Sequence, residues 1–246
     1  MDNHIYLSPH LDDAVFSCGG VIYQQTSSGE EVLVVTIFAG DPVDGQLSPY
    51  AQSLHERWGI DQASVESRRQ EDIRACARLG AQYLHLSFPE CIYRFGLNRA
   101  PYYVSDEALF GEVHPEEGEL QEHIASKLSE VCSGEPSVYV PIAYGGHVDH
   151  QLVRGAVSSI KIKPHYYKDF PYAIRGEDTP SDWVLPSGEE RCTQLTDQEF
   201  QIWAEAIKEY TSQLSTFWED IQTIEVELRD AHDQMKGIPF IFPKKD

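Results

Sequence analysis

The chain has 246 residues, of which 40 are acidic and 19 are basic, so its formal net charge is −21 at pH 7. Such a charge repels polyanions and argues against nucleic acid or an anionic membrane as a partner. No apolar run approaches the ~18–20 residues of a transmembrane helix, and this length is enough for one large domain with its own core.

The cysteines are scattered along the chain, and none is part of a Cys-x-x-Cys pair. Their number is five, which is odd, and this pattern indicates free thiols in a reducing compartment. The chain opens on a strand-like segment and not on the basic region and apolar core of a signal peptide. We therefore expect a cytoplasmic protein.

The first predicted strand, residues 4–8, runs into a polar cluster that contains His10, Asp12 and Asp13. In α/β sheets, chemistry takes place outside the carboxyl ends of the strands. Two adjacent carboxylates beside an imidazole are costly to bury unless they share a proton or a cation neutralises them. His10 and Asp13 are therefore candidate ligands of a divalent metal, with Asp12 beside it. The alternative is that Asp12 or Asp13 caps the next helix and that His10 bonds to a backbone carbonyl.

The next segments alternate between helix and strand patterns. A helix is predicted over residues 17–25, and the nearly continuous apolar run at 31–38 is typical of a central parallel strand. Gly19 and Gly20 lack the GxGxxG spacing, so we expect close packing of the helix on the sheet there and no phosphate site.

Residues 54–79 are predicted to be mostly helical and carry Arg68. Arg68 either pairs with neighbouring acids on a solvated face or reaches the site and binds a substrate hydroxyl or acid. Strand 83–88 follows, and Glu90 and Arg94 lie beyond its carboxyl end. These two residues are candidate substrate contacts, and the alternative is an ordinary surface ion pair.

A second polar cluster repeats the layout of the first. After a helix at 119–132, the strand predicted at 137–142 leads through a small loop to His147, Asp149 and His150, and a helix begins directly after them. Two such clusters at the ends of two strands of one sheet can converge.

Together the clusters offer His10, Asp13 and one histidine of the second group as metal ligands. Three protein ligands are the number that a catalytic zinc uses when its fourth position is kept for water. Nitrogen and oxygen donors with no cysteine pair nearby fit zinc or iron(II).

The last third of the chain contains a predicted strand at 163–168, a loop or hairpin at 174–195, a helix at 197–218 and a charged tail at 219–246. The alternation of elements predicts a single α/β domain over residues 1–246, with a Rossmann-like, mainly parallel sheet flanked by helices.

The two polar clusters carry a family resemblance. Residues 9–13 (Pro-His-Leu-Asp-Asp) resemble the PHPDD(E) signature, and residues 147–150 (His-Val-Asp-His) resemble the HxDH signature, of the LmbE-like / PIG-L superfamily of zinc-dependent N-acetylglucosaminyl deacetylases. Further similar segments are 68–71, 77–80, 166–172 and 208–213. The chain departs from the family pattern at Leu11, where proline is usual, and at Ala14, where glutamate is frequent.

The resemblance implies an LmbE-like fold and a metal held by His10, Asp13 and His150. Zinc is the implied metal, with iron(II) as the second choice. It further implies that Asp12 is the general base for a water nucleophile and that His147 polarises the amide carbonyl.

The same roles follow from the chemistry of amide hydrolysis. A metal lowers the pKa of water, a carboxylate beside it transfers the proton, and a positive partner such as a His147 imidazolium stabilises the oxyanion. Asp149 would keep that imidazole charged and in the right tautomer. The alternatives are a helix N-cap for Asp149 and an exposed loop position for His147.

We therefore expect a zinc-dependent hydrolase that removes an N-acetyl (N-acyl) group from a small-molecule amino sugar or its conjugate. One alternative is a metal-dependent amidase for a non-sugar N-acyl metabolite. Another is a non-catalytic sugar- or nucleotide-binding protein with a Rossmann-like fold. The tryptophan- and tyrosine-rich segments serve either substrate binding or contacts in a homo-oligomer.

Overall fold

The computed structural model describes residues 3–58, 64–176, 179, 183 and 185–243. Its strands are β1 (Asn3–Ser8), β2 (Glu31–Thr36), β3 (Gln82–His85), β4 (Ser137–Pro141), β5 (His165–Tyr167), β6 (Gly188–Thr193) and β7 (Ile238–Pro243). They form one sheet in the order β3-β2-β1-β4-β5-β7-β6. The first five strands of this order are parallel, while β7 is antiparallel to both of its neighbours. The predicted Rossmann-like, mainly parallel α/β fold is thus confirmed.

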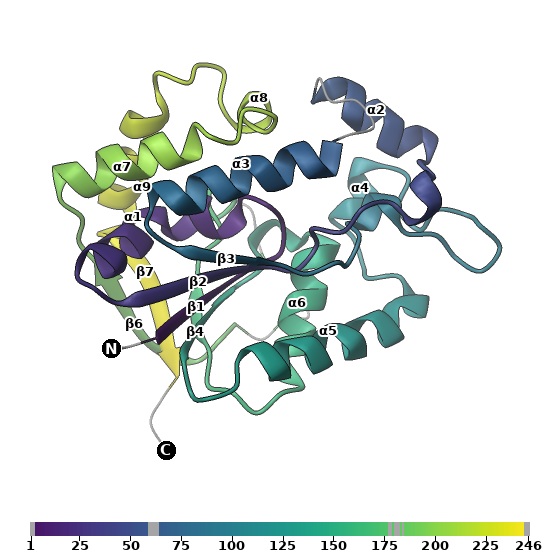
Figure 1. Cartoon of the computed structure of the whole chain (residues 1–246), viewed down its shortest axis with the longest axis horizontal. Helices are drawn as coiled ribbons and strands as arrows, with labels where there is room; N and C mark the ends of the chain where they lie inside the picture. Colours follow the sequence, from purple (N-terminus) through teal and green to yellow (C-terminus); the bar gives the residue numbers. More distant parts are fainter. Residues whose placement is uncertain (1–2, 59–63, 177–178, 180–182, 184, 244–246) are drawn as a thin grey trace.

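Helices cover both faces of the sheet (Figure 1). The α-helices are α1 (Asp13–Ser27), α2 (Pro49–Arg57), α3 (Ser64–Arg78), α4 (Asp106–Leu109), α5 (Gly118–Val131), α6 (Val148–Ser158), α7 (Asp197–Ile207), α8 (Leu214–Phe217) and α9 (Ile224–Met235). Short 3-10 helices are η1 (Val43–Gly45), η2 (Cys91–Tyr93), η3 (Pro115–Glu117) and η4 (Tyr144–Gly146). Helices α1, α3, α7 and α9 lie on one face, and α5 and α6 lie on the other.

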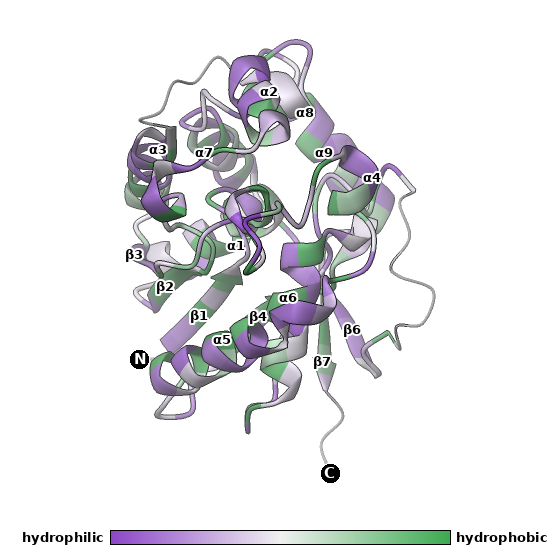
Figure 2. Cartoon of the chain, turned by 90° about the vertical axis from the view of Figure 1, so that its right-hand side faces the viewer, coloured by the Kyte–Doolittle hydropathy of each residue, from purple (hydrophilic) through white to green (hydrophobic). Residues whose placement is uncertain are grey.

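Two of the apolar clusters pack against the sheet, one on each face. Alternate residues of β1 enter different clusters: Tyr6 packs with the side of α1 and α7, whereas Ile5 and Leu7 pack with the side of α5 and α6. A strand that is buried on both faces needs apolar residues at every position, which explains the continuous apolar runs in the sequence. Figure 2 shows hydrophilic and hydrophobic residues alternating along α5, as expected for a helix with one face on the sheet.

The C-terminal third differs from the prediction. The helix expected over 197–218 ends at Ile207, and the separate α8 begins at Leu214. Between them the chain turns, because Glu71 of α3 accepts hydrogen bonds from the Thr211 hydroxyl and from the backbone N–H and hydroxyl of Ser212.

The segment expected to be a charged tail contains α9 and β7. Pro239 and Pro243 argue against a central strand, because proline cannot donate a backbone hydrogen bond. Nevertheless β7 pairs with β5 on one side and with β6 on the other. The segment 174–195, predicted to be a loop or hairpin, contains β6. This strand pairs with β7 and not with another strand of the same segment. These pairings join residues far apart in the chain, so local patterns do not contain them.

All five cysteines are free thiols, as expected. Within the described residues, we find no helix with the length and apolar character needed to cross a membrane.

Gly19 permits a close contact between two helices. The indole of Trp203 in α7 lies against α1 and donates its Nε1–H to the Val15 carbonyl at 2.7 Å. A Cβ atom at Gly19 would lie 2.4 Å from Trp203 Cδ1. The glycine therefore serves close packing, as expected, but against a helix and not against the sheet.

We predict that Gly19→Ala destabilises the protein. Alanine gains up to about 1 kcal/mol in helix propensity, but overpacking a filled core costs about 1–3 kcal/mol, so the clash with Trp203 dominates. Gly118→Ala is the matched control, since a Cβ there meets nothing within 4 Å. Urea unfolding should show a lower midpoint for Gly19→Ala only, and equal midpoints for the two variants would contradict the prediction.

Candidate active site

The two polar clusters meet at the carboxyl ends of β1 and β4. These strands are neighbours in the sheet, and the strand order reverses between them, since β2 and β3 lie on one side and β4 and β5 on the other. A crevice at such a switch point is where open α/β sheets bind ligands. The cluster after β1 leads into α1, and the cluster after β4 leads into α6.

Asp13 lies between two imidazoles. Its Oδ2 atom is 3.2 Å from His10 Nδ1 and 3.2 Å from His150 Nε2. Two ligands about 2.0 Å from a tetrahedral zinc lie about 3.3 Å apart. Both distances from Asp13 to a histidine therefore fit the spacing of two ligands on one divalent metal.

The other nitrogen of each imidazole faces a second carboxylate. His10 Nε2 lies 2.9 Å from Asp149 Oδ2, and His150 Nδ1 lies 2.8 Å from Asp169 Oδ1. A protonated ring donates through both nitrogens, to Asp13 on one side and to the outer carboxylate on the other. When such a ring loses the proton that faces Asp13, the outer carboxylate keeps the remaining N–H, and His10 Nδ1 or His150 Nε2 becomes free to ligate a metal. Outer carboxylates of this kind orient histidine ligands and raise their basicity.

The electrostatics of the three donors point to a cation. Burial disfavours charge on His10, but its hydrogen bonds to Asp13 and Asp149 hold its pKa well above the usual value. Burial acts likewise on His150, whose contacts with Asp13 and Asp169 raise its pKa to about 9. Burial raises the pKa of Asp13, but the two histidines outweigh this effect and lower the pKa well below its ordinary value. Positive charge is therefore stabilised where the three donor atoms meet.

Asp169 was not among the residues singled out for the site. It follows the carboxyl end of β5, and its Oδ2 accepts the backbone N–H groups of Ala143 and Tyr144, next to η4. The signal in the sequence was the same as for the first two clusters, an acid directly after a strand. It was weaker because no histidine accompanies this acid.

Asp12 is the N-cap residue of α1, but its side chain makes no capping hydrogen bond. The side chain borders a cavity at the carboxyl end of the sheet. Burial and the neighbouring Asp13 raise the pKa of Asp12 to about 7, although Arg68 and His10 act in the opposite direction. A group with this pKa can accept and release a proton near neutral pH.

His147 is the N-cap of α6, a position that the alternative reading gave to Asp149. Its Nδ1 accepts the backbone N–H of Asp149 at 3.2 Å, so a neutral ring carries its proton on Nε2. Burial and the nearby His10 and His150 lower the pKa of His147 well below its usual value. The structure thus favours a neutral Nε2–H donor over the expected imidazolium. The Asp149 carboxylate hydrogen-bonds to His10 and Arg94, and its charge opposes this lowering of the His147 pKa without outweighing it.

The three expected substrate contacts separate into two groups. Arg68 and Glu90 are buried, form an ion pair of 2.5 Å and border the cavity. Arg68 Nε is buried without a hydrogen-bond partner. Arg94 pairs with Glu117 and Asp149 behind the cavity and is not among the residues that line it. Neither arginine forms an exposed surface pair.

The cavity has a volume of about 180 Å³. Beside the polar cluster it has an apolar wall that includes Trp58, Phe110, Tyr172 and Phe217. The ring of Phe110 packs edge-on against His147, with centroids 5.4 Å apart. Two of these four aromatic residues come from the last third of the chain.

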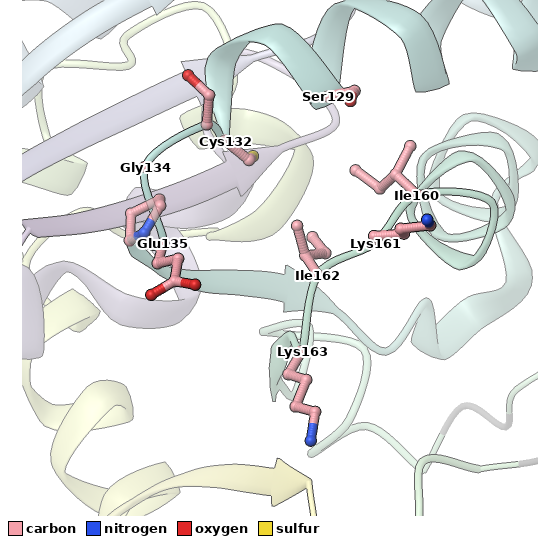
Figure 3. A pocket seen from close by; sticks show the side chains of 10 residues that line it. Ser129, Cys132, Gly134, Glu135, Ile160, Lys161, Ile162 and Lys163 are labelled. Carbon is pink, nitrogen blue, oxygen red and sulfur yellow. The ribbon is translucent and has the colours of Figure 1, made fainter.

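A larger hollow of about 710 Å³ opens near the amino ends of β4 and β5, between the end of α5 and residues 160–163 (Figure 3). Cys132, Glu135 and Lys163 are among its lining residues. It contains no member of the histidine–carboxylate cluster, so the chemistry and not the size identifies the site.

A switch-point crevice with a histidine–carboxylate centre is an arrangement that could hold a metal ion in a Rossmann-like α/β protein. The model of the GlcNAc-PI de-N-acetylase (PIG-L) family matches residues 5–161. The chain belongs to this family, as the two motifs predicted.

Two relatives are named 2'-N-acetylparomamine deacetylase. The protein of Niallia circulans is 30% identical over 184 residues, and that of Streptomyces fradiae is 31% identical over 177 residues. The matches cover 68% and 69% of this chain, and 66% and 57% of the relatives. The match thus spans less than two thirds of either relative.

Solved structures match over nearly the full chain. The zinc-inhibited form of teicoplanin deacetylase Orf2 has a TM-score of 0.81 at 24% identity, with 99% of this chain and 100% of that chain covered. This likeness shows the fold. The A40926 pseudoaglycone deacetylase has a TM-score of 0.74 at 28% identity, covering 98% of this chain and 96% of that chain.

We predict that Asp169→Asn weakens metal binding by about 10- to 100-fold, because His150 loses the carboxylate that fixes its tautomer. The control is Asp72→Asn, which alters a similar buried pair with His85 outside the cluster. Chelator competition on the metal-free proteins should separate the two variants. Equal metal affinities would contradict the role of Asp169.

Proposed function

We propose that this protein is a zinc-dependent hydrolase that removes the N-acetyl group from an amino sugar or an amino-sugar conjugate. We further propose that residues 1–246 form one catalytic domain. The observation that carries the proposal is the convergence of His10 Nδ1 and His150 Nε2 on Asp13 Oδ2, with Asp12 and His147 at the same cavity. The names of the two relatives support the substrate class.

His10, Asp13 and His150 are the proposed metal ligands. Two imidazoles and one carboxylate are borderline-to-hard donors that suit zinc, and iron(II) takes the same set. When bound, such a metal acts as a Lewis acid on the amide carbonyl and lowers the pKa of water to about 7. Asp149 and Asp169 hold the two histidines in the ligating tautomers.

Asp12 is the proposed general base. Its carboxylate borders the cavity next to Asp13, and no capping bond occupies it. With a pKa of about 7, it takes a proton from the attacking water and then gives a proton to the leaving amine.

His147 is the proposed oxyanion donor. The helix-capping bond at Nδ1 leaves Nε2–H as the donor. A neutral, preorganised N–H stabilises developing negative charge without first having to acquire a proton. Asp149 hydrogen-bonds to this histidine through its backbone N–H, while its carboxylate contacts His10 and Arg94.

Arg68 and Glu90 are the proposed substrate contacts, and both line the cavity with Asp12. Arg68 lines the cavity, and its guanidinium is suited to donate a hydrogen bond to a substrate oxygen. Glu90 fixes the guanidinium, and the Trp58 ring lies 5.5 Å from it. The aromatic wall offers a platform for the apolar face of a sugar ring. Arg94 is not part of this proposal, since it lies behind the cavity.

The first test is metal content combined with acetate release. We expect about one zinc per chain, as for a single catalytic site, and deacetylation of N-acetylglucosamine or an N-acetylated aminoglycoside that stops on chelation and returns with zinc. If only non-sugar N-acyl compounds are hydrolysed, the substrate is another kind of amide and not an amino sugar. If the protein takes up no metal after reconstitution, the proposal is refuted.

The second test separates catalysis from metal binding. Asp12→Asn should lower kcat by about 100- to 10,000-fold through loss of the general base, with the metal retained. His147→Phe should lower it by about 100- to 1000-fold through loss of the oxyanion donor. His10→Ala and His150→Ala should lose the metal itself. Full activity of Asp12→Asn would refute the assigned mechanism.

A further inference from the structure

A buried chain of polar contacts runs from the metal site into the body of the protein. Arg94 Nη1 donates to Asp149 Oδ1 at 2.6 Å, and Asp149 Oδ2 lies 2.9 Å from His10 Nε2. On its other side, the guanidinium donates to both carboxylate oxygens of Glu117, which also accepts the Tyr103 hydroxyl at 2.5 Å.

Three groups hold the Asp149 carboxylate in place. The residue is fully buried, and its carboxylate accepts from His10, from Arg94 and from the backbone N–H of Cys91 at 3.0 Å. A buried carboxylate without a partner of opposite charge is strongly destabilising, so Arg94 is a necessary partner of Asp149.

Arg94 is itself held from several directions. Besides the ion pairs, Nη1 donates to the Pro89 carbonyl at 3.2 Å, and the guanidinium lies 5.1 Å from the Phe38 ring and 5.5 Å from the Tyr103 ring. Only a planar, forked cation can bond to two carboxylates and a carbonyl while its faces stack on rings.

We propose that Arg94 is a positioning residue of the metal site, which holds the Asp149 carboxylate on His10 and so directs His10 Nδ1 toward the metal. This inference rests on the proposed function in one respect, namely that His10 is a metal ligand. It gives Arg94 a role different from the substrate contact expected at first.

The network also anchors part of the substrate side. Tyr103 and Glu117 stand at the two ends of the segment that contains α4 and the cavity-lining Leu109 and Phe110. The Tyr103 hydroxyl accepts the His114 backbone N–H at 2.8 Å and donates to Glu117. Arg94 thus connects the segment that walls the cavity with the histidine that faces the metal.

The test compares Arg94→Met, Arg94→Lys and Glu117→Gln with the wild-type protein by chelator competition for zinc. We expect Arg94→Met to bind zinc about 10- to 100-fold more weakly, the range found when partners of ligating residues are removed. Arg94→Lys should recover part of this loss, because lysine keeps the charge but not the fork. Cobalt(II) spectra should change with the altered position of His10.

Arg68→Met is the matched control, since it breaks an equally buried arginine–glutamate pair that does not touch a histidine of the cluster. It should lower stability in urea unfolding without weakening zinc binding, because it removes a positive charge near the site and leaves the histidine partners in place. The double variant Arg94→Met/Asp149→Asn should bind zinc no more weakly than Asp149→Asn alone, because Arg94 acts through Asp149.

The outcomes distinguish the two proposals. If wild-type protein binds zinc and Arg94→Met binds it equally well, the role of Arg94 is wrong and the proposed function stands. If the wild-type protein takes up no metal, the proposed function fails, and this inference fails with it. If Arg94→Met does not fold, Arg94→Lys and Glu117→Gln decide, and unchanged zinc affinity in both overturns the role.

Discussion

The arrangement of one carboxylate between two imidazoles is the constraint on which the site depends. Asp13 Oδ2 lies 3.2 Å from a nitrogen of His10 and 3.2 Å from a nitrogen of His150. Buried groups of this kind are stable only when each charge has a partner and each N–H an acceptor. The surrounding structure meets that demand with Asp149 on one histidine and Asp169 on the other.

These partners come from distant parts of the chain. Asp169 lies beyond residues 5–161, the stretch that the family model matches. The last third also supplies Tyr172 and Phe217 to the cavity wall, and β7 completes the sheet beside β5. The two motifs therefore provide the donors, while the remainder of the fold orients them and shapes the space in front of them.

Chemically similar residues take different places in this fold. Arg68 and Arg94 are both buried and paired with glutamate, and both followed patterns that predict substrate contact. The helix α3 presents Arg68 to the cavity, whereas Arg94 follows η2 and turns toward Asp149 and Glu117. His147 and Asp149 show the same point, since the histidine caps α6 and the carboxylate serves His10. The direction of a side chain near the end of a strand therefore depends on its contacts with other segments of the chain.

The sequence by itself determined the fold class, the five parallel strands and the family. Continuous apolar runs between turn residues are dictated by burial on both faces of the sheet, and the two histidine–aspartate clusters follow directly from β1 and β4. Only the tertiary structure decided the rest. The position of β7 between β5 and β6, the carboxylate of Asp169 on His150 and the turn of Arg94 away from the cavity each depend on contacts between residues far apart in the chain. Such contacts leave no periodic signal, because their energy comes from the pairing of buried charges and backbone groups and not from local propensity.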